Sequence, residues 1–392
     1  MKKAAQDGSP ARQSDSKNAA TSQKVKGVTV IQLAMAIGTA IIGVGLLAYP
    51  RVTVNYVMTA APLTTAIAVF FGLWISLAIA YLGGKHPKLT IFEYGDQLVG
   101  KWIGGLIHTL IIINFLGLAA IAAREFGEVV VTSVLQRTPV EVTVLTMLIL
   151  AATAARNTVL VVVRILTFYM PWVYFPALII ILLTLKSSNY INLLPLYHIT
   201  HLKNLLMAAM NIIGLFQNIF IAGIIIPHMV HSDRAWKGVL VGVGSAGSLY
   251  IMLMTATLGI FGAEEMKHIL WPTLDLAKTA ALPGLFLERL DPIFIAVWVT
   301  AVFTGILSSY YSAIQGLAHV LRLRDHRILS TLVFPIIFML ALIPRNIANL
   351  YDYGVVMVII GTSLTMVYPL LLLLFHLLKR GKKQKKGALQ HA

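Results

Sequence analysis

The chain is organised around the stretch Gly38-Thr39-Ala40-Ile41-Ile42-Gly43-Val44-Gly45. It lies in the middle of the first long apolar run, Val28 to Tyr49. Its three glycines make a poor helix centre, because glycine costs about 1 kcal/mol relative to alanine at such a site. In hydrocarbon, freed backbone groups are tolerated only where they are buried in protein or line a polar cavity. The stretch therefore predicts either a broken membrane helix whose bare backbone binds a small polar ligand, or a helix-packing face of small residues.

The composition predicts a membrane protein. The chain has 392 residues, of which 58% are hydrophobic and 12% are charged, and its mean hydropathy is +0.82. A soluble fold cannot bury that much apolar surface, so we expect an all-α polytopic membrane protein. The net charge of +16 comes mostly from tails and short loops, which favours topology signals and contacts with membrane lipids over a nucleic-acid partner. The absence of cysteine excludes disulfides and thiol catalysis.

About ten transmembrane helices are expected from the apolar runs. The expected spans are residues 28–50, 60–83, 103–123, 140–156, 158–186, 204–229, 237–262, 291–321, 328–345 and 352–379. Between spans two and three, Lys85 to Lys101 predicts a short amphipathic helix on the membrane surface. Between spans seven and eight, Pro272, Pro283 and Gly284 divide residues 263–290 into short pieces.

The distribution of basic residues predicts that both termini are cytoplasmic. With the N-terminus inside, about 22 of the 31 lysines and arginines fall on the cytoplasmic side. This bias of better than two to one is typical of the positive-inside rule. The remaining nine fall outside: Arg51, Arg124, Arg137, Lys186, Lys203, Lys267, Lys278, Arg289 and Arg345.

Ten spans divide into two halves of five. Because each half has an odd number of spans, the second half starts on the opposite side of the membrane and is inverted relative to the first. We expect a disordered basic tail (1–27), a first five-helix repeat (28–187), a second five-helix repeat (188–380) and a second basic tail (381–392), with both tails cytoplasmic. The first span of the second half carries Phe220-Ile221-Ala222-Gly223-Ile224-Ile225-Ile226-Pro227, which again interrupts an apolar run. Paired interruptions in corresponding places favour a transporter-type binding site over a packing face.

The first of these stretches, extended to Ile37–Pro50, resembles the first helix of the amino acid–polyamine–organocation transporters. Other stretches resemble one branch of that superfamily, the spore germination permeases, which are the B subunits of nutrient germinant receptors. They are His86-Pro87-Lys88-Leu89-Thr90-Ile91-Phe92-Glu93-Tyr94, Leu98-Val99-Gly100-Lys101-Trp102-Ile103-Gly104, Trp271-Pro272-Thr273-Leu274, Leu287-Glu288-Arg289-Leu290-Asp291, Trp298 and Phe303. The resemblance covers about residues 25–380. It implies a 5+5 inverted-repeat transporter fold with broken helices 1 and 6.

The same resemblance implies a function and partners. The chain would sense a small nutrient, usually an amino acid, in the spore inner membrane, as a multi-pass protein. It would act with an A subunit and a C-subunit lipoprotein to trigger germination. The alternative is an amino acid permease of the same superfamily, either a proton-coupled symporter or an exchanger. An enzyme is not expected, because no nucleophile–base pair or phosphate loop is found.

An amino acid would need two kinds of partner. Its carboxylate suits backbone N–H groups at the start of a half-helix, where the macrodipole is positive, and its ammonium suits carbonyl oxygens of unwound turns. For the amides the alternative role is an interhelical hydrogen bond, and for the tyrosines it is core or interfacial packing. The expected ligand-binding residues are Gly38, Thr39, Ile42, Gly43, Gly45, Asn114, Gln217, Asn218, Gly223, Tyr310 and Tyr311.

One charged residue lies inside an apolar run. Arg164 falls between Val159 and Tyr169, where a charge is expensive and should face protein or water. Either it snorkels to the interface, or it is a fixed cation in place of a coupling ion between spans one, five and eight. The histidines have no metal-ligand spacing, so we expect no metal site and no cofactor.

Overall fold

The computed structural model describes residues 27–185, 187–195, 201–280 and 291–390. The predicted N-terminal tail, except for Gly27, therefore lies outside the described residues, as do Pro283, Gly284 and the stretch 287–290. The α-helices are α2 (Val30–Ile41), α3 (Tyr49–Val57), α4 (Ala61–Lys85), α5 (Ile91–Val99), α6 (Lys101–Ser133), α7 (Val140–Ala155), α8 (Val159–Leu185), α9 (Leu202–Gly214), α10 (Ala222–Ile225), α11 (Ala235–His268), α12 (Pro272–Thr279), α13 (Asp291–Val320), α14 (Arg327–Ala341) and α15 (Ile347–Gln390). Short 3₁₀ turns join several of them: η1 (Val44–Leu46), η2 (Met58–Ala60), η3 (Tyr190–Leu193), η4 (Gln217–Ile221), η5 (Ile226–His228) and η6 (Ser232–Arg234).

The ten predicted spans correspond to these helices. Among the described residues, six helices are long and apolar enough to cross a membrane, or seven if the bent pair in residues 202–228 counts as one span. Three shorter apolar helices, α2, α7 and α14, supply the remainder. The predicted all-α multi-pass fold is confirmed. The second basic tail, predicted over 381–392, is helical as far as Gln390 because α15 continues into it.

The first span is broken where the glycines are. Thr29 begins α2 through a capping box with Gln32, and the helix ends at Ile41 because Ile42 adopts extended backbone angles. After η1, α3 begins with Pro50 in its first turn, a position that needs no backbone donor. The predicted break is confirmed.

The sixth span is also broken, but earlier than the sequence pattern indicates. α9 ends at Gly214, and the segment Gln217–His228 is bent by 44° relative to it. The predicted interruption, residues 220–227, is itself helical, with the 3₁₀ turns η4 and η5 on either side of α10. Pro227 lies in the first turn of η5, a position at which proline does not interrupt a helix.

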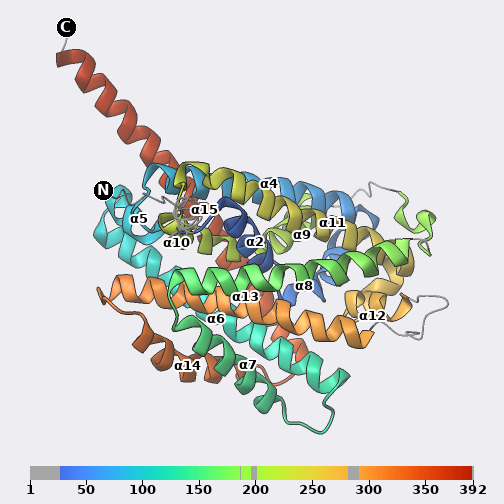
Figure 1. Cartoon of the computed structure of the whole chain (residues 1–392). Helices are drawn as coiled ribbons and strands as arrows, with labels where there is room; N and C mark the ends of the chain where they lie inside the picture. Colours follow the sequence, from blue (N-terminus) through green and yellow to red (C-terminus); the bar gives the residue numbers. More distant parts are fainter. Residues whose placement is uncertain (1–26, 186, 196–200, 281–290, 391–392) are drawn as a thin grey trace, which may run out of the picture.

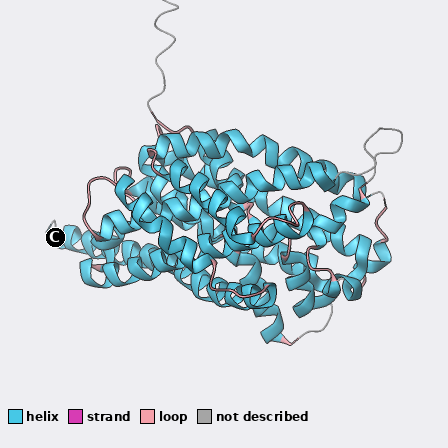
Figure 2. Ribbon diagram, turned by 90° about the horizontal axis from the view of Figure 1, so that it is seen from below, coloured by secondary structure: helices cyan, strands magenta, loops and turns pink. Residues whose placement is uncertain are grey.

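The packing places both breaks in the centre of the molecule. α2 packs against α8 and α11, and α13 packs against α6. α7 and α14 lie together on the outside of α6 and α13 (Figure 1). The surface helix α5 lies at one end of the molecule, together with the C-terminal part of α15, and α12 lies at the opposite end. These are called the α5 end and the α12 end below. Figure 2, turned by 90° from Figure 1, shows the same helical bundle from below.

Backbone hydrogen bonds join the starts and ends of the two broken spans. Val28, just before α2, forms a parallel bridge with Met229. The N–H of Val28 donates to the carbonyl of His228 at 2.9 Å, and the N–H of Val230 donates to the carbonyl of Val28 at 3.1 Å. The first and sixth spans are thus connected directly at the α5 end.

Candidate functional site

A cavity of about 160 Å³ lies between the two breaks. Gly43 and Gly45 of the first break line it, together with Gln217 and Asn218 of the sixth span. Drug-sized ligands occupy pockets of roughly 300–1,000 Å³, so this cavity suits a smaller molecule. Its wall is completed by α6, α13 and the start of α15.

Glycine allows the first break to lie directly on α13. A Cβ atom built on Gly305 would lie 3.2 Å from the Cα of Gly43, and one on Gly43 would lie 3.7 Å from the Cα of Gly305. Both residues line the cavity. The bare backbone predicted at the first break is therefore present, and it faces a second glycine rather than a side chain.

Asn218 connects three of the elements around the cavity. Its Nδ2 donates to the carbonyl of Ala40 at the end of α2 (3.0 Å) and to the carbonyl of Gly305 on α13 (3.3 Å). Its Oδ1 accepts a hydrogen bond from the Ser309 hydroxyl at 2.8 Å. Since the side chain is buried, these bonds fix the relative position of α2, α13 and η4.

A second buried amide pair lies beside it. Asn114 on α6 donates from Nδ2 to Oε1 of Gln217 at 2.9 Å, and Gln217 donates from Nε2 to the Thr362 hydroxyl on α15 at 3.4 Å. Gly361 makes room for this pair, since a Cβ there would lie 2.2 Å from Oδ1 of Asn114. That oxygen is buried and has no hydrogen-bond partner among the described residues, which leaves one acceptor free next to the cavity.

The wall toward the α12 end is polar and aromatic. Glu125 of α6 and Tyr351 of α15 both line the cavity, and the Tyr351 hydroxyl donates to Oε1 of Glu125 at 3.3 Å. Trp271 donates from Nε1 to the same hydroxyl at 3.0 Å. The guanidinium of Arg51 lies 4.9 Å from the centre of the Tyr351 ring, within cation–π range. A buried carboxyl group thus lies at one side of the cavity.

Two tyrosines stabilise the open end of α2. Tyr250 of α11 donates from its hydroxyl to the carbonyl of Ile41 at 3.1 Å, and the Tyr49 hydroxyl donates to the carbonyl of Tyr250. The two rings are edge to face, with centroids 5.1 Å apart. The last carbonyls of a helix need such partners when no further turn follows.

The structure brings together four of the predicted ligand-binding residues, namely Gly43, Gly45, Gln217 and Asn218, in the cavity lining. Asn114 is one hydrogen bond away from it. The Thr39 hydroxyl donates to the carbonyl of Met35 in its own helix, at 2.8 Å, and does not line the cavity. Gly38 and Ile42 are buried outside the lining, and a Cβ on Gly38 would meet the Tyr174 hydroxyl at 3.2 Å.

Three further predicted residues contact protein groups outside the cavity lining. Tyr310 donates to the carbonyl of Ser330 on α14, and the Tyr311 hydroxyl accepts from Nε2 of Gln315 at 2.7 Å. Gly223 packs against Ile91 of α5, where a Cβ would lie 2.7 Å from the Cβ of that isoleucine. For the tyrosines this arrangement matches the core-packing alternative.

Arg164 is exposed on α8 and does not line the cavity. A fixed cation between spans one, five and eight would have to be buried among them. Its exposure favours the snorkelling alternative, in which the guanidinium reaches the interface.

Sequence reasoning missed the glutamate in the cavity wall. Glu125 lies just beyond the predicted end of span three at residue 123, whereas α6 continues to Ser133. The signal was present, since Arg124, Glu125 and Glu128 continue an apolar helix, and Arg124 forms an i,i+4 ion pair with Glu128 at 2.8 Å. A longer span would have placed the carboxyl group of Glu125 within the membrane.

Comparison with known proteins gives a consistent set of relatives. Spore germination protein YndE of Bacillus subtilis (strain 168) is 26% identical over 368 residues, which cover 91% of this chain and 98% of that protein. Spore germination protein A2 of the same organism is 27% identical over 285 residues, covering 72% and 77%. Spore germination protein B2 is 23% identical over 366 residues, covering 93% and 98%.

The fold is similar to that of a solved transporter. The nucleobase-cation-symport-1 family transporter Mhp1, in a closed conformation with bromovinylhydantoin bound, matches with a TM-score of 0.63 at 10% identity, over 83% of this chain and 74% of that one. At this identity the likeness concerns the fold alone. The family model described as spore germination protein matches residues 27–350, and the chain belongs to that family of germination permeases.

Proposed function

We propose that this chain is the transporter-fold subunit of a spore germinant receptor and that it binds a small nutrient, an amino acid, in the cavity between its two broken spans. The observation that carries the proposal is the convergence of both breaks on one cavity through Asn218. In this fold, interrupted helices are where substrates bind.

The lining offers complementary groups for the two charges of an amino acid. The backbone at Gly43 and Gly45 is bare, which suits a carboxylate. Glu125 provides a carboxyl group on the α6 side, which suits an ammonium. Binding would favour one of two packings of the broken spans, and an A subunit and a C-subunit lipoprotein in the spore inner membrane would respond to that shift.

Thermal unfolding of the purified chain with a panel of amino acids, sugars and nucleobases tests the proposal. We expect at least one amino acid to raise the Tm, and Glu125→Gln to abolish that shift. Glu141→Gln is the matched control, because Glu141 is an exposed glutamate on α7. If no amino acid shifts the Tm, the proposed ligand class is wrong; if Glu125→Gln responds like wild type, Glu125 does not bind the ligand.

The second candidate function is an amino acid permease, either proton-coupled or an exchanger. The likeness in fold to a transporter favours it. Uptake of labelled amino acid into proteoliposomes that contain this chain alone would support the permease. Co-purification with A-type and C-type subunits, together with ligand binding and no uptake, would support the receptor.

A further inference from the structure

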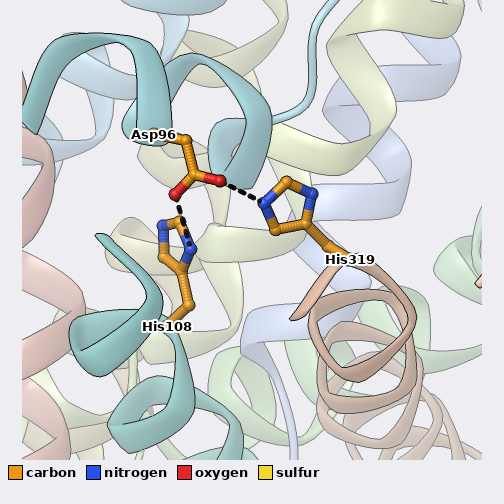
Figure 3. Close-up of side chains that lie close together, drawn as sticks. All are labelled: Asp96, His108 and His319. Carbon is orange, nitrogen blue, oxygen red and sulfur yellow. Dashed lines mark hydrogen bonds and ion pairs between the residues drawn. The ribbon is translucent and has the colours of Figure 1, made fainter. Parts of the chain in front are cut away.

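Three potential metal ligands gather at the α5 end (Figure 3), in a cavity that shares no lining residue with the central one. They are Asp96 of α5, His108 of α6 and His319 of α13, and one ligand atom from each lies within 4.8 Å of the others. Nε2 of His319 lies 2.9 Å from Oδ2 of Asp96, and Nδ1 of His108 lies 3.5 Å from Oδ1 of Asp96. The sequence shows no metal-ligand spacing for these three residues, because they lie on three separate helices.

Two of the facing atoms are buried without hydrogen bonds to any described residue: Nδ1 of His108 and Oδ1 of Asp96. The His108 side chain is fully buried, and its other nitrogen, Nε2, lies 2.6 Å from the Tyr368 hydroxyl. When Nε2–H donates to Tyr368, the lone pair of Nδ1 points at a carboxylate oxygen. With this tautomer two acceptors face each other, and a cation between them would satisfy both.

The surroundings hold these side chains in place. Phe92 packs edge to face on the His108 ring, with centroids 5.1 Å apart, and is stacked with the His319 ring at 6.0 Å. Gly104 lets the start of α6 approach α5, since a Cβ there would lie 2.4 Å from Oδ1 of Asp96. The hydrogen bond of His108 to Tyr368 is the kind of contact that orients a histidine ligand in a metal site.

We propose that Asp96, His108 and His319 bind a divalent transition-metal ion such as Zn²⁺. Two imidazoles and one carboxylate, with a water molecule as fourth ligand, form a common open zinc site. Tetrahedral ligands at about 2.0–2.1 Å from the ion lie roughly 3.4 Å apart. The spacing of His108 and Asp96 already matches this value, and the most distant pair has to approach by at most about 1.4 Å.

Solvent reaches the site. The three residues line a cavity of about 510 Å³ at the α5 end, which offers an entry path and room for a water ligand. Lys101, Arg322 and Arg324 also line this cavity, but all three are exposed, so water and salt screen their charge. Asp96 and His319 are about one-fifth exposed, and only His108 is sealed off.

A bound ion would join the surface helix α5 to α6 and α13. α5 also packs against the sixth span, through Ile91 and Gly223. Metal occupancy would therefore hold α5 in place beside the second half of the sixth span. This inference does not depend on the nutrient, since the site shares no lining residue with the central cavity.

The test is Zn²⁺ binding to the full chain, purified with a histidine-free tag and stripped with a chelator. We expect one Zn²⁺ per chain, and His319→Gln should weaken binding by at least about 100-fold, because the loss of an outer-shell partner alone costs about 10–100-fold. Tyr368→Phe should weaken it by about 10-fold or more for the same reason. His326→Ala is the matched control, since His326 lines the same cavity outside the group of three.

A rescue variant separates ligation from folding. His319→Cys supplies a thiolate, which is a good zinc ligand. Since the natural sequence has no cysteine, this thiolate would be the only one in the variant. We expect it to restore Zn²⁺ binding and to give a thiolate-to-cobalt absorption band with Co²⁺. Absence of stoichiometric Zn²⁺ binding to wild type, or equal affinity of His319→Gln and His326→Ala, would overturn the proposal and leave a hydrogen-bonded cluster.

Discussion

The Asn218 side chain forms hydrogen bonds through both Nδ2 and Oδ1, and all of its partners are distant in the sequence. It bonds Ala40 of the first span, and Gly305 and Ser309 of α13. A buried amide with all its partners specifies one arrangement, whereas the loss of one partner leaves the others unsatisfied. Asn218 therefore fixes the end of α2 and the middle of α13 relative to the sixth span.

Asn218→Ala should destabilise the protein by about 1–3 kcal/mol, because it leaves a buried hydroxyl and two carbonyls without this partner. It should also abolish ligand-induced stabilisation. Thermal unfolding in detergent, with and without ligand, measures both effects. Asn157→Ala is the control, since Asn157 is exposed and bonds only carbonyls of the preceding turn; equal effects of the two variants would refute the role of Asn218.

Arg164→Lys and Arg164→Ala should leave the nutrient dose–response unchanged. The guanidinium is exposed on α8, and a lysine snorkels to the interface equally well. A clamp that used the planar fork of arginine would instead be damaged by both substitutions. A shift of the dose–response in both variants, at unchanged protein level, would restore the ion-substitute hypothesis.

At the scale of elements, α5 is a short helix that depends on its cap. The predicted amphipathic helix is present as Ile91–Val99, and Thr90 forms a capping box with Glu93. Gly100, with a φ of 98°, then reverses the chain into α6 at an angle that a residue with a Cβ rarely adopts. The cap and this turn bring Asp96 back against the first turns of α6.

Thr90→Ala should cost about 1 kcal/mol, the usual loss for an N-cap. Hydrogen exchange should become faster in the first turn of α5. Thr29→Ala is the matched control, because Thr29 forms the equivalent capping box at the start of α2. The expectation fails if exchange in α5 responds equally to both variants.

The break in the first span could be predicted from sequence because its glycines act locally on the backbone. The break in the sixth span could not be placed, since it follows Gly214, whereas the predicted residues 220–227 are helical. Which face of each helix is buried in the protein could not be predicted. Lipid tails are as apolar as leucine, so residues that face lipid and residues that face the core are of the same types. Arg164 and Tyr310 illustrate this: both lie in apolar helices, yet one is exposed and the other is buried. The partner of Asn114 is 103 positions away, a distance at which one sequence gives no contact information.

At the scale of the whole molecule, the two ends differ in chemistry. Lysines and arginines of the loops gather near the α5 end, with Lys88, Lys101, Arg322 and Arg324, and the C-terminal part of α15 lies at the same end. The positive-inside rule therefore predicts that this end is cytoplasmic. The central cavity includes Tyr351 and Glu125 on the side of the α12 end, which would then face outward.

Single cysteines test this orientation, since the chain has none of its own. Lys88 and Glu264 are exposed at opposite ends of the molecule, next to α5 and near the end of α11. A membrane-impermeant thiol reagent should label Glu264→Cys in intact cells and Lys88→Cys only after the membrane is opened. Labelling of both from the same side would contradict the ten-span topology.

The bridge between Val28 and Met229 has a mechanical consequence. It consists of two backbone hydrogen bonds, so no side-chain substitution removes its partners. It joins the residues before α2 to the end of the sixth span, and the two breaks lie beyond it on each side. We therefore expect a ligand that displaces the half-helix on one side of the bridge to move the half-helix on the other side with it.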